Sequence, residues 1–121
     1  MSTTALTKDT FEDTVIGDGI VLVDWWASWC GPCMSFAPVF EEASERHADV
    51  TFAKVDTEAE PVLAQEFNIR SIPTIMAIRE GVVVFQQAGA LPERALESLI
   101  EQVRELDMAE VKANAEEHSH Q

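Results

Sequence analysis

Apolar residues follow two patterns along this chain, and each pattern predicts one type of element. The run Ile20–Trp26 is apolar and rich in β-branched residues, which is typical of a strand covered on both faces. From Pro32 onward, apolar residues instead recur every three or four positions, which predicts a helix, and similar stripes follow Pro61 and Pro92. Further strands are predicted at 51–56, where apolar and polar residues alternate, and at 74–78 and 82–87.

The order of these elements predicts an α/β fold. A short edge strand is expected at Ala5–Thr7, followed by a helix that is capped by Asp9 or Thr10 and ends near Ile16. The last two strands are separated only by residues 79–81, which suits an antiparallel hairpin. The whole order is β, α, β, α, β, α, β, β, α, and it predicts a mixed central sheet of about five strands between layers of helices, about four in all.

Chain length indicates one domain. With 121 residues the chain can build one proper core, which we place at 1–108, and the acidic remainder at 109–121 is expected to be a frayed helix or disordered. This extension contains His118 and His120, which we interpret as part of a solvated tail. His47 lies among charged residues and is expected to be an ordinary surface histidine.

The charge balance narrows the classes of partner. Eight basic and 22 acidic residues give a formal net charge of −14, which argues against binding to nucleic acid or to an anionic membrane. The segment Met1–Lys8 lacks the apolar core of a signal peptide, and no apolar run is long enough to span a bilayer. We therefore expect a cytoplasmic location, and nothing in the sequence demands more than a monomer.

Both cysteines of the chain lie where the strand Ile20–Trp26 gives way to a helix. Cys30 and Cys33 are separated by two residues, and so small a ring removes too little chain entropy to act mainly as a structural staple. Pro32 suits the first helical position, so unpaired backbone N–H groups should favour a thiolate at Cys30. Cys30 is therefore the expected nucleophile, and Cys33 the shielded partner that resolves the mixed disulfide.

Strand alternation places a carboxylate among large apolar side chains. Leu22, Asp24 and Trp26 share one face of the predicted strand. Asp24 could be a strand-end residue that reaches water, or a buried group with a chemical role. Burial without a full ion partner would raise its pKa and allow proton exchange with a nearby thiol.

A resemblance to a known family bears on these alternatives. The chain resembles the thioredoxin family from about Leu6 to Val103, and the resemblance is carried by Trp29, Cys30, Gly31, Pro32 and Cys33 after an apolar strand. It implies the thioredoxin fold, a helix kinked at Pro38, and a buried aspartate, here Asp24, beneath the second cysteine. It also implies that Lys54 lies near this aspartate and tunes it.

The resemblance includes a second motif, Ile72-Pro73-Thr74. A trans bond before Pro73 is the default from sequence alone, but in the family this proline is cis and packs against the cysteines. The implied peptide groove consists of Trp29, Gly31, Pro32, Ile72, Pro73 and Gly89. Two departures from the family pattern are Met34, where a basic residue is common, and Thr57, where many relatives have an aliphatic residue.

Three functions compete at this point. The resemblance implies a general protein disulfide reductase without a bound cofactor, whose oxidised pair is re-reduced by thioredoxin reductase with electrons from NADPH. A zinc-binding module fails because two cysteines and three scattered histidines supply no second ligand pair. A non-catalytic thioredoxin-fold subunit of a larger complex remains the alternative.

Overall fold

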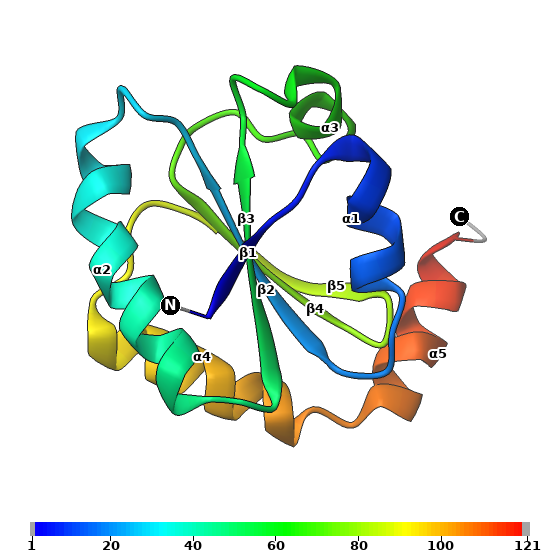
Figure 1. The fold of residues 1–121 in the computed structure, drawn as a ribbon. Coiled ribbons are helices and arrows are strands. Elements are labelled where there is room, and N and C mark those ends of the chain that lie inside the picture. The colour runs from blue at the N-terminus through cyan, green and yellow to red at the C-terminus, as the bar shows by residue number, and fades with distance from the viewer. Residues whose placement is uncertain (1, 120–121) are drawn as a thin grey trace.

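A single five-stranded mixed sheet forms the centre of the molecule (Figure 1). A computed structural model describes residues 2–119 of the chain, with side chains through residue 114. The sheet has the order β1-β3-β2-β4-β5. β1 and β2 pair parallel with β3, whereas β4 pairs antiparallel with both β2 and β5. The strands are β1 (Thr3–Ala5), β2 (Ile20–Trp26), β3 (Val50–Asp56), β4 (Thr74–Arg79) and β5 (Val82–Ala88).

Helices cover both faces of the sheet, as expected for a three-layer fold (Figure 1). The described residues form five helices, so the expected number of four was wrong, and the additional helix is the C-terminal one. They are α1 (Lys8–Val15), α2 (Gly31–Arg46), α3 (Pro61–Glu66), α4 (Glu93–Glu105) and α5 (Met108–Ser119). None of the helices in the described part of the chain is long and apolar enough to cross a membrane.

The alternation predicted for β2 sorts its side chains into two cores. Leu22 packs in one buried cluster with residues of α2 and α4, such as Phe40 and Leu96. Val23 and Trp25 pack in the other cluster with residues of α1 and α3. Every residue of β2 except Trp26 is buried, which explains why this stretch is apolar at every position but Asp24.

The chain turns tightly between β4 and β5. Glu80 and Gly81 connect the two strands, and their φ angles are 53° and 78°. Two successive residues with positive φ are typical of the hairpin turn that matches the twist of the flanking strands. The expected antiparallel hairpin is thus confirmed, with each strand one residue longer than the pattern indicated.

The N-terminal elements begin earlier than expected. β1 ends at Ala5, so the prediction of a strand at Ala5–Thr7 was displaced by two residues. The N-cap of α1 is Thr7, not Asp9 or Thr10. Thr10 still contributes to this end of the helix, because its hydroxyl oxygen accepts a hydrogen bond of 2.9 Å from the Thr7 backbone N–H.

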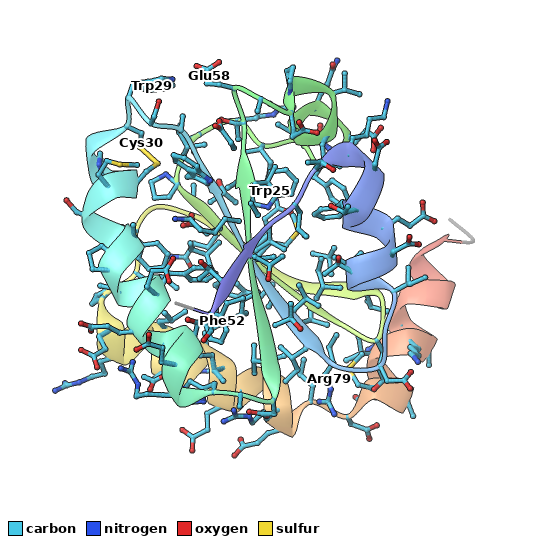
Figure 2. The ribbon with its side chains drawn as sticks, in the orientation of Figure 1. Trp25, Trp29, Cys30, Phe52, Glu58 and Arg79 are labelled. Carbon is cyan, nitrogen blue, oxygen red and sulfur yellow. A yellow bond between two sulfur atoms is a disulfide. The ribbon has the colours of Figure 1, made fainter. Side chains whose placement is uncertain are left out.

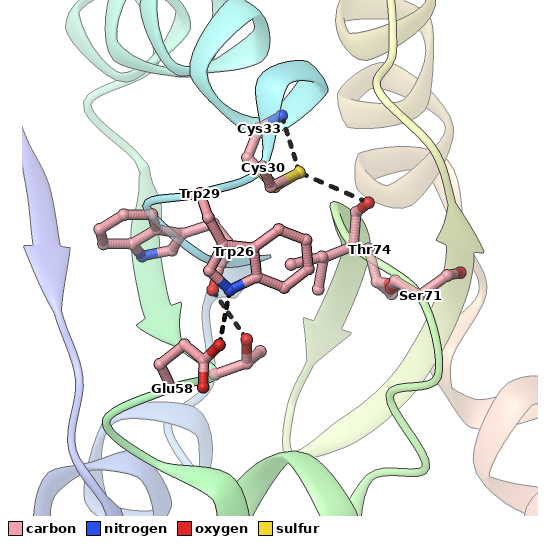
Figure 3. The surroundings of a disulfide bond; sticks show 9 residues. Trp26, Trp29, Cys30, Cys33, Glu58, Ser71 and Thr74 are labelled. Atoms are coloured by element: carbon pink, nitrogen blue, oxygen red, sulfur yellow. Dashed lines mark hydrogen bonds between the residues drawn. A yellow bond between two sulfur atoms is a disulfide. The ribbon is translucent and has the colours of Figure 1, made fainter.

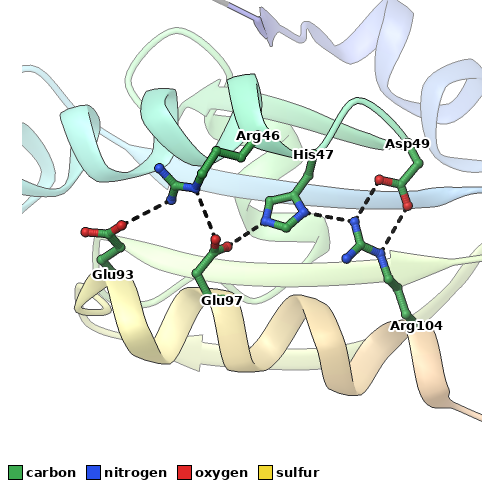
Figure 4. A network of polar contacts seen from close by, with 6 residues as sticks. All are labelled: Arg46, His47, Asp49, Glu93, Glu97 and Arg104. Atoms are coloured by element: carbon green, nitrogen blue, oxygen red, sulfur yellow. Dashed lines mark hydrogen bonds and ion pairs between the residues drawn. The ribbon is translucent and has the colours of Figure 1, made fainter.

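His47 joins a network of charged side chains between α2 and α4, which Figure 4 shows. Its Nε2 lies 2.6 Å from Glu97 Oε2, and its Nδ1 lies 2.9 Å from Arg104 Nη2. Arg104 also pairs with Asp49 at 2.7 Å. The His47 side chain is only 17% exposed, so the expectation of an ordinary surface histidine was wrong.

The first turns of α5 pack against the end of the hairpin. Met108 is buried, and Lys112 Nζ lies 2.7 Å from Glu80 Oε1. Asp107 Oδ1 accepts hydrogen bonds from the first backbone N–H groups of the helix. The division into a 1–108 domain and a 109–121 extension stays a prediction, and the side chains of His118 and His120 lie outside the described residues.

Candidate active site

The two cysteines lie at the N-terminus of α2, where they form a disulfide with a Cα–Cα distance of 5.2 Å (Figure 3). Cys30 is the N-cap of this helix, and its Sγ accepts a hydrogen bond of 3.2 Å from the Cys33 backbone N–H. A sulfur in this position receives an unpaired N–H group and the positive end of the helix dipole. Both features favour negative charge on Cys30 once the pair is reduced.

The cysteines face the loop that precedes β4. Cys30 Sγ lies 3.7 Å from the carbonyl oxygen of Ile72, and the Ile72–Pro73 peptide bond is cis. The Pro73 carbonyl in turn accepts a hydrogen bond of 2.7 Å from the Gly89 backbone N–H. The structure thus links Cys30, Ile72, Pro73 and Gly89 through successive contacts. In this oxidised state Cys30 is 5% exposed and Cys33 is 1% exposed.

A groove with a volume of about 400 Å³ lies beside Ile72, whose carbonyl oxygen faces Cys30. It is lined by Trp29, Thr57, Ile69, Arg70, Ser71 and Ile72. Trp29 stands 69% exposed at its rim, while Gly31 and Pro32 are exposed on the first turn of α2. The groove therefore contains two of the expected substrate-binding residues, Trp29 and Ile72, and the departure at Thr57 is part of its wall.

Glu58 belongs to this site although sequence reasoning did not single it out. The indole Nε1–H of Trp29 donates a hydrogen bond of 2.5 Å to Glu58 Oε1 (Figure 3). Figure 2 shows Trp29, Cys30 and Glu58 at the same end of the molecule. An exposed glutamate in so acidic a chain carries no signal of its own, because only the fold brings it next to the tryptophan.

Asp24 is fully buried in the centre of the sheet. Neither of its carboxylate oxygens has a hydrogen-bond partner among the described residues. Burial raises the pKa of Asp24 to about 7, although the positive charge of Lys54 lowers the pKa in part. The alternative that this carboxylate reaches water at a strand end was wrong.

Lys54 is the register partner of Asp24 on β3. Its side chain is half-buried, and its Nζ lies 5.1 Å from the centroid of the Trp26 ring. Lys54 is thus the strand neighbour of the buried carboxylate, and its ammonium also lies over an aromatic ring. No group of three or more histidine, cysteine or acidic residues among the described ones could hold a metal ion.

Comparisons with known proteins agree with this geometry. The family profile described as thioredoxin matches residues 2–102. Putative thioredoxin 2 of Streptomyces coelicolor is 57% identical over 98% of this chain and 89% of its own length. Thioredoxin of Alicyclobacillus acidocaldarius is 44% identical over 84% of this chain and 98% of its own, and thioredoxin 1 of Synechococcus elongatus is 41% identical over 80% and 92%. The chain therefore belongs to the thioredoxin family of thiol–disulfide oxidoreductases.

Proposed function

We propose that Cys30 is the attacking sulfur of a protein disulfide reductase and that Cys33 completes its cycle. The observation that carries this assignment is the position of Cys30 as N-cap of α2, with its Sγ on the Cys33 N–H and 3.7 Å from the Ile72 carbonyl. Cys33 lies one turn further into the helix and is the less exposed of the two. These positions suit an attacking and a resolving sulfur, respectively.

The proposed cycle moves two electrons. The Cys30 thiolate attacks one sulfur of a substrate disulfide, the substrate S–S bond breaks, and the second substrate sulfur leaves and takes up a proton. Cys33 then loses its proton and attacks Cys30 Sγ in the resulting mixed disulfide, which expels the first substrate sulfur as a thiol. The Cys30–Cys33 disulfide of the structure is the oxidised end of this cycle.

Asp24 is proposed as the base that takes the proton of Cys33. A group whose pKa is about 7 can both accept and return a proton at neutral pH. Asp24 lies on the face of β2 that also carries Leu22, and this face is covered by α2, the helix that contains Cys33. Lys54 is proposed to tune this base through its charge.

Substrate is proposed to bind as an extended segment along the groove beside Cys30. The Ile72 carbonyl is directed at Cys30 Sγ and could pair with a substrate backbone next to its disulfide. Trp29, Gly31, Pro32, Pro73 and Gly89 would form the surrounding surface. Pairing with the main chain leaves substrate side chains largely unspecified, so one groove can accept many different proteins.

The oxidised pair needs an electron donor to return to the dithiol. We propose thioredoxin reductase as this partner, with electrons from NADPH, because this recharging accompanies the family. We also propose that the chain works as a monomer in the cytoplasm. The supporting argument is chemical, since a reducing compartment keeps a reactive cysteine pair in its dithiol form.

Insulin reduction tests the proposed reaction. Dithiothreitol reduces insulin disulfides slowly, and the chain should accelerate the resulting precipitation because its dithiol attacks first and is then regenerated. Cys30→Ser should abolish the acceleration, and the exposed Ser28→Ala on the same loop should leave it unchanged. If the native chain gives no acceleration, it is the non-catalytic subunit that we considered as the alternative.

A further inference from the structure

Lys54, on β3, neighbours two residues of β2 that share one face of the sheet. It pairs in register with Asp24, and its ammonium lies 5.1 Å from the ring centroid of Trp26, two residues further along the strand. A cation at this distance from an indole ring is attracted by the negative face of the π system. The ring therefore restrains the ammonium at the position from which it acts on the carboxylate.

The backbone that carries the ring is held from the next loop. The Trp26 carbonyl oxygen accepts two hydrogen bonds from Thr57, one of 2.8 Å from its backbone N–H and one of 3.0 Å from its hydroxyl. These bonds fix the backbone of Trp26 at the end of β2. Lys54, in contrast, has a long flexible stem and is only half-buried, so without the ring its ammonium could turn toward water.

We propose that Trp26 is a positioning residue that acts through Lys54 to set the proton affinity of Asp24. The proposal rests on the proposed role of Asp24 as the base for Cys33 and extends it to a neighbouring aromatic residue. The indole holds the ammonium, the ammonium stabilises the ionised carboxylate, and the ionised fraction of Asp24 decides how much base is available at neutral pH.

The surroundings of Asp24 make Lys54 the dominant charge on it. The opposite register partner, on β4, is the uncharged Ile75. The helices over this face contribute apolar side chains such as Phe36 and Leu96. At the start of α2 the titratable groups are the thiols of Cys30 and Cys33, which are tied up while the disulfide is intact. The acidic and basic residues of this helix follow only from residue 41 onward. Burial raises the pKa of Asp24, and Lys54 is the charged group whose field lowers it.

Loss of the indole should therefore raise the pKa of Asp24. The test uses the oxidised protein, in which the cysteines do not titrate, and follows the Asp24 carboxyl carbon by NMR as a function of pH. Trp26→Leu removes the π face, and we expect a rise of roughly 0.4 to 0.7 pKa unit, which corresponds to the energy of a partly exposed cation–π contact. Trp26→Phe keeps a weaker ring and should give a smaller rise.

The matched control is the same pair of substitutions in a Lys54→Met background. There the ring has no ammonium to hold, so neither Trp26→Leu nor Trp26→Phe should raise the pKa further. Water that enters after loss of the indole would change the pKa in both backgrounds, and the difference between backgrounds removes that contribution. Trp26→Phe keeps the test valid if Trp26→Leu does not fold.

An unchanged Asp24 pKa in both Trp26 variants would overturn the proposal, and so would an equal rise in the Lys54→Met background. These outcomes are distinguishable from failure of the proposed function, because the titration requires no turnover. If the Trp26 variants shift the pKa as expected but Asp24→Asn reduces insulin at the native rate, Trp26 is a positioning residue for a carboxylate that the reaction does not use.

Discussion

At the residue scale, the burial of Asp24 affects both the reaction and the stability of the fold. It is fully buried, has no hydrogen-bond partner among the described residues, and has a pKa near 7 instead of its ordinary 3.8. A carboxylate in this environment destabilises the fold whenever it is ionised. The same burial gives it a proton affinity suited to exchange with a thiol. One feature therefore lowers the stability of the fold and favours the proposed proton transfer.

The pH dependence of stability tests this cost. Below about pH 4 the carboxyl is protonated in both the folded and the unfolded chain, so burial carries no ionic penalty. As the pH rises from about 4 to about 7, the unfolded chain ionises first, and the folded state should lose on the order of 4 kcal/mol from this group. We expect Asp24→Asn to remove this loss, as measured by urea unfolding of the oxidised proteins at pH values around 4 and 8.

For each protein, the unfolding free energy at the higher pH is compared with that at the lower pH. This comparison cancels the destabilisation caused by the buried amide of Asp24→Asn, which does not depend on pH. Equal losses in the native chain and in Asp24→Asn between the two pH values would show that the folded carboxyl titrates normally.

Residues differ in how far sequence could predict them. Cys30 and Asp24 could be identified because a short motif and strand alternation are local signals. Glu58 and His47 could not, because their partners Trp29 and Glu97 are 29 and 50 positions away in the chain. A polar side chain is assigned to the surface by composition, and only the fold shows which other polar group it meets.

At the element scale, the active site and the C-terminal helix α5 lie at opposite ends of the molecule. The N-terminus of α2 carries the cysteines, whereas α5 covers the opposite end, at the turn between β4 and β5 (Figure 1). Arg79, at that opposite end in Figure 2, donates hydrogen bonds to the carbonyl oxygens of Val103, Arg104 and Leu106. These bonds add hydrogen-bond donors to the carbonyl oxygens at the C-terminal end of α4.

Met108 should contribute stability but not activity. Its side chain is buried where α5 meets the domain, so Met108→Ala should lower the free energy of unfolding by about 2 kcal/mol through lost burial and a residual cavity. The rate of insulin reduction should stay at the native value because the site lies at the other end. Denaturant unfolding and the insulin assay measure the two effects.

The neighbouring Glu110 is exposed, and Glu110→Ala should change the stability by less than about 0.5 kcal/mol. A loss of activity in Met108→Ala at full folding would mean that α5 communicates with the cysteines.

The sequence predicted which elements with strong periodicity exist, but not the residues at which they begin and end. Apolar runs and helical stripes located β2 to β5 and the helices α2, α3 and α4. The start of α1 depends on a hydroxyl contact between Thr7 and Thr10, which several nearby residues could have made equally well. α5 has few apolar residues, so its composition resembled that of a solvated tail. Its contact with the rest of the molecule depends on single long-range pairs, such as Lys112 with Glu80, and sequence does not reveal these.

At the scale of the whole molecule, the net charge of −14 acts on every approaching reactant. Charged side chains of one sign create a potential that extends about 10 Å from the surface at an ionic strength of 0.1 M. Glu58 adds a negative charge beside the groove, whose lining contains one cation, Arg70. Cationic disulfides should therefore be concentrated near Cys30 relative to anionic ones.

Two small disulfides of opposite charge test this steering. At low ionic strength the reduced chain should react with the cation cystamine at least roughly threefold faster than with the anion dithiodiglycolate, after each rate is divided by the rate with dithiothreitol alone. Added salt should diminish the ratio because it screens the potential. A ratio that does not change with salt would show that contacts within the groove, and not the overall charge, select the substrate.

The central claim, that Cys30 attacks and Cys33 resolves, is tested most directly by trapping the mixed disulfide. Reduced Cys33→Ser is mixed with a disulfide-bonded protein, and the product is digested and sequenced by mass spectrometry without reductant. We expect a stable mixed disulfide at Cys30, since no second sulfur remains to release it, and no such product from Cys30→Ser, whose remaining sulfur is shielded. A stable adduct at Cys33 in Cys30→Ser, with none at Cys30 in Cys33→Ser, would reverse the assignment and contradict this account.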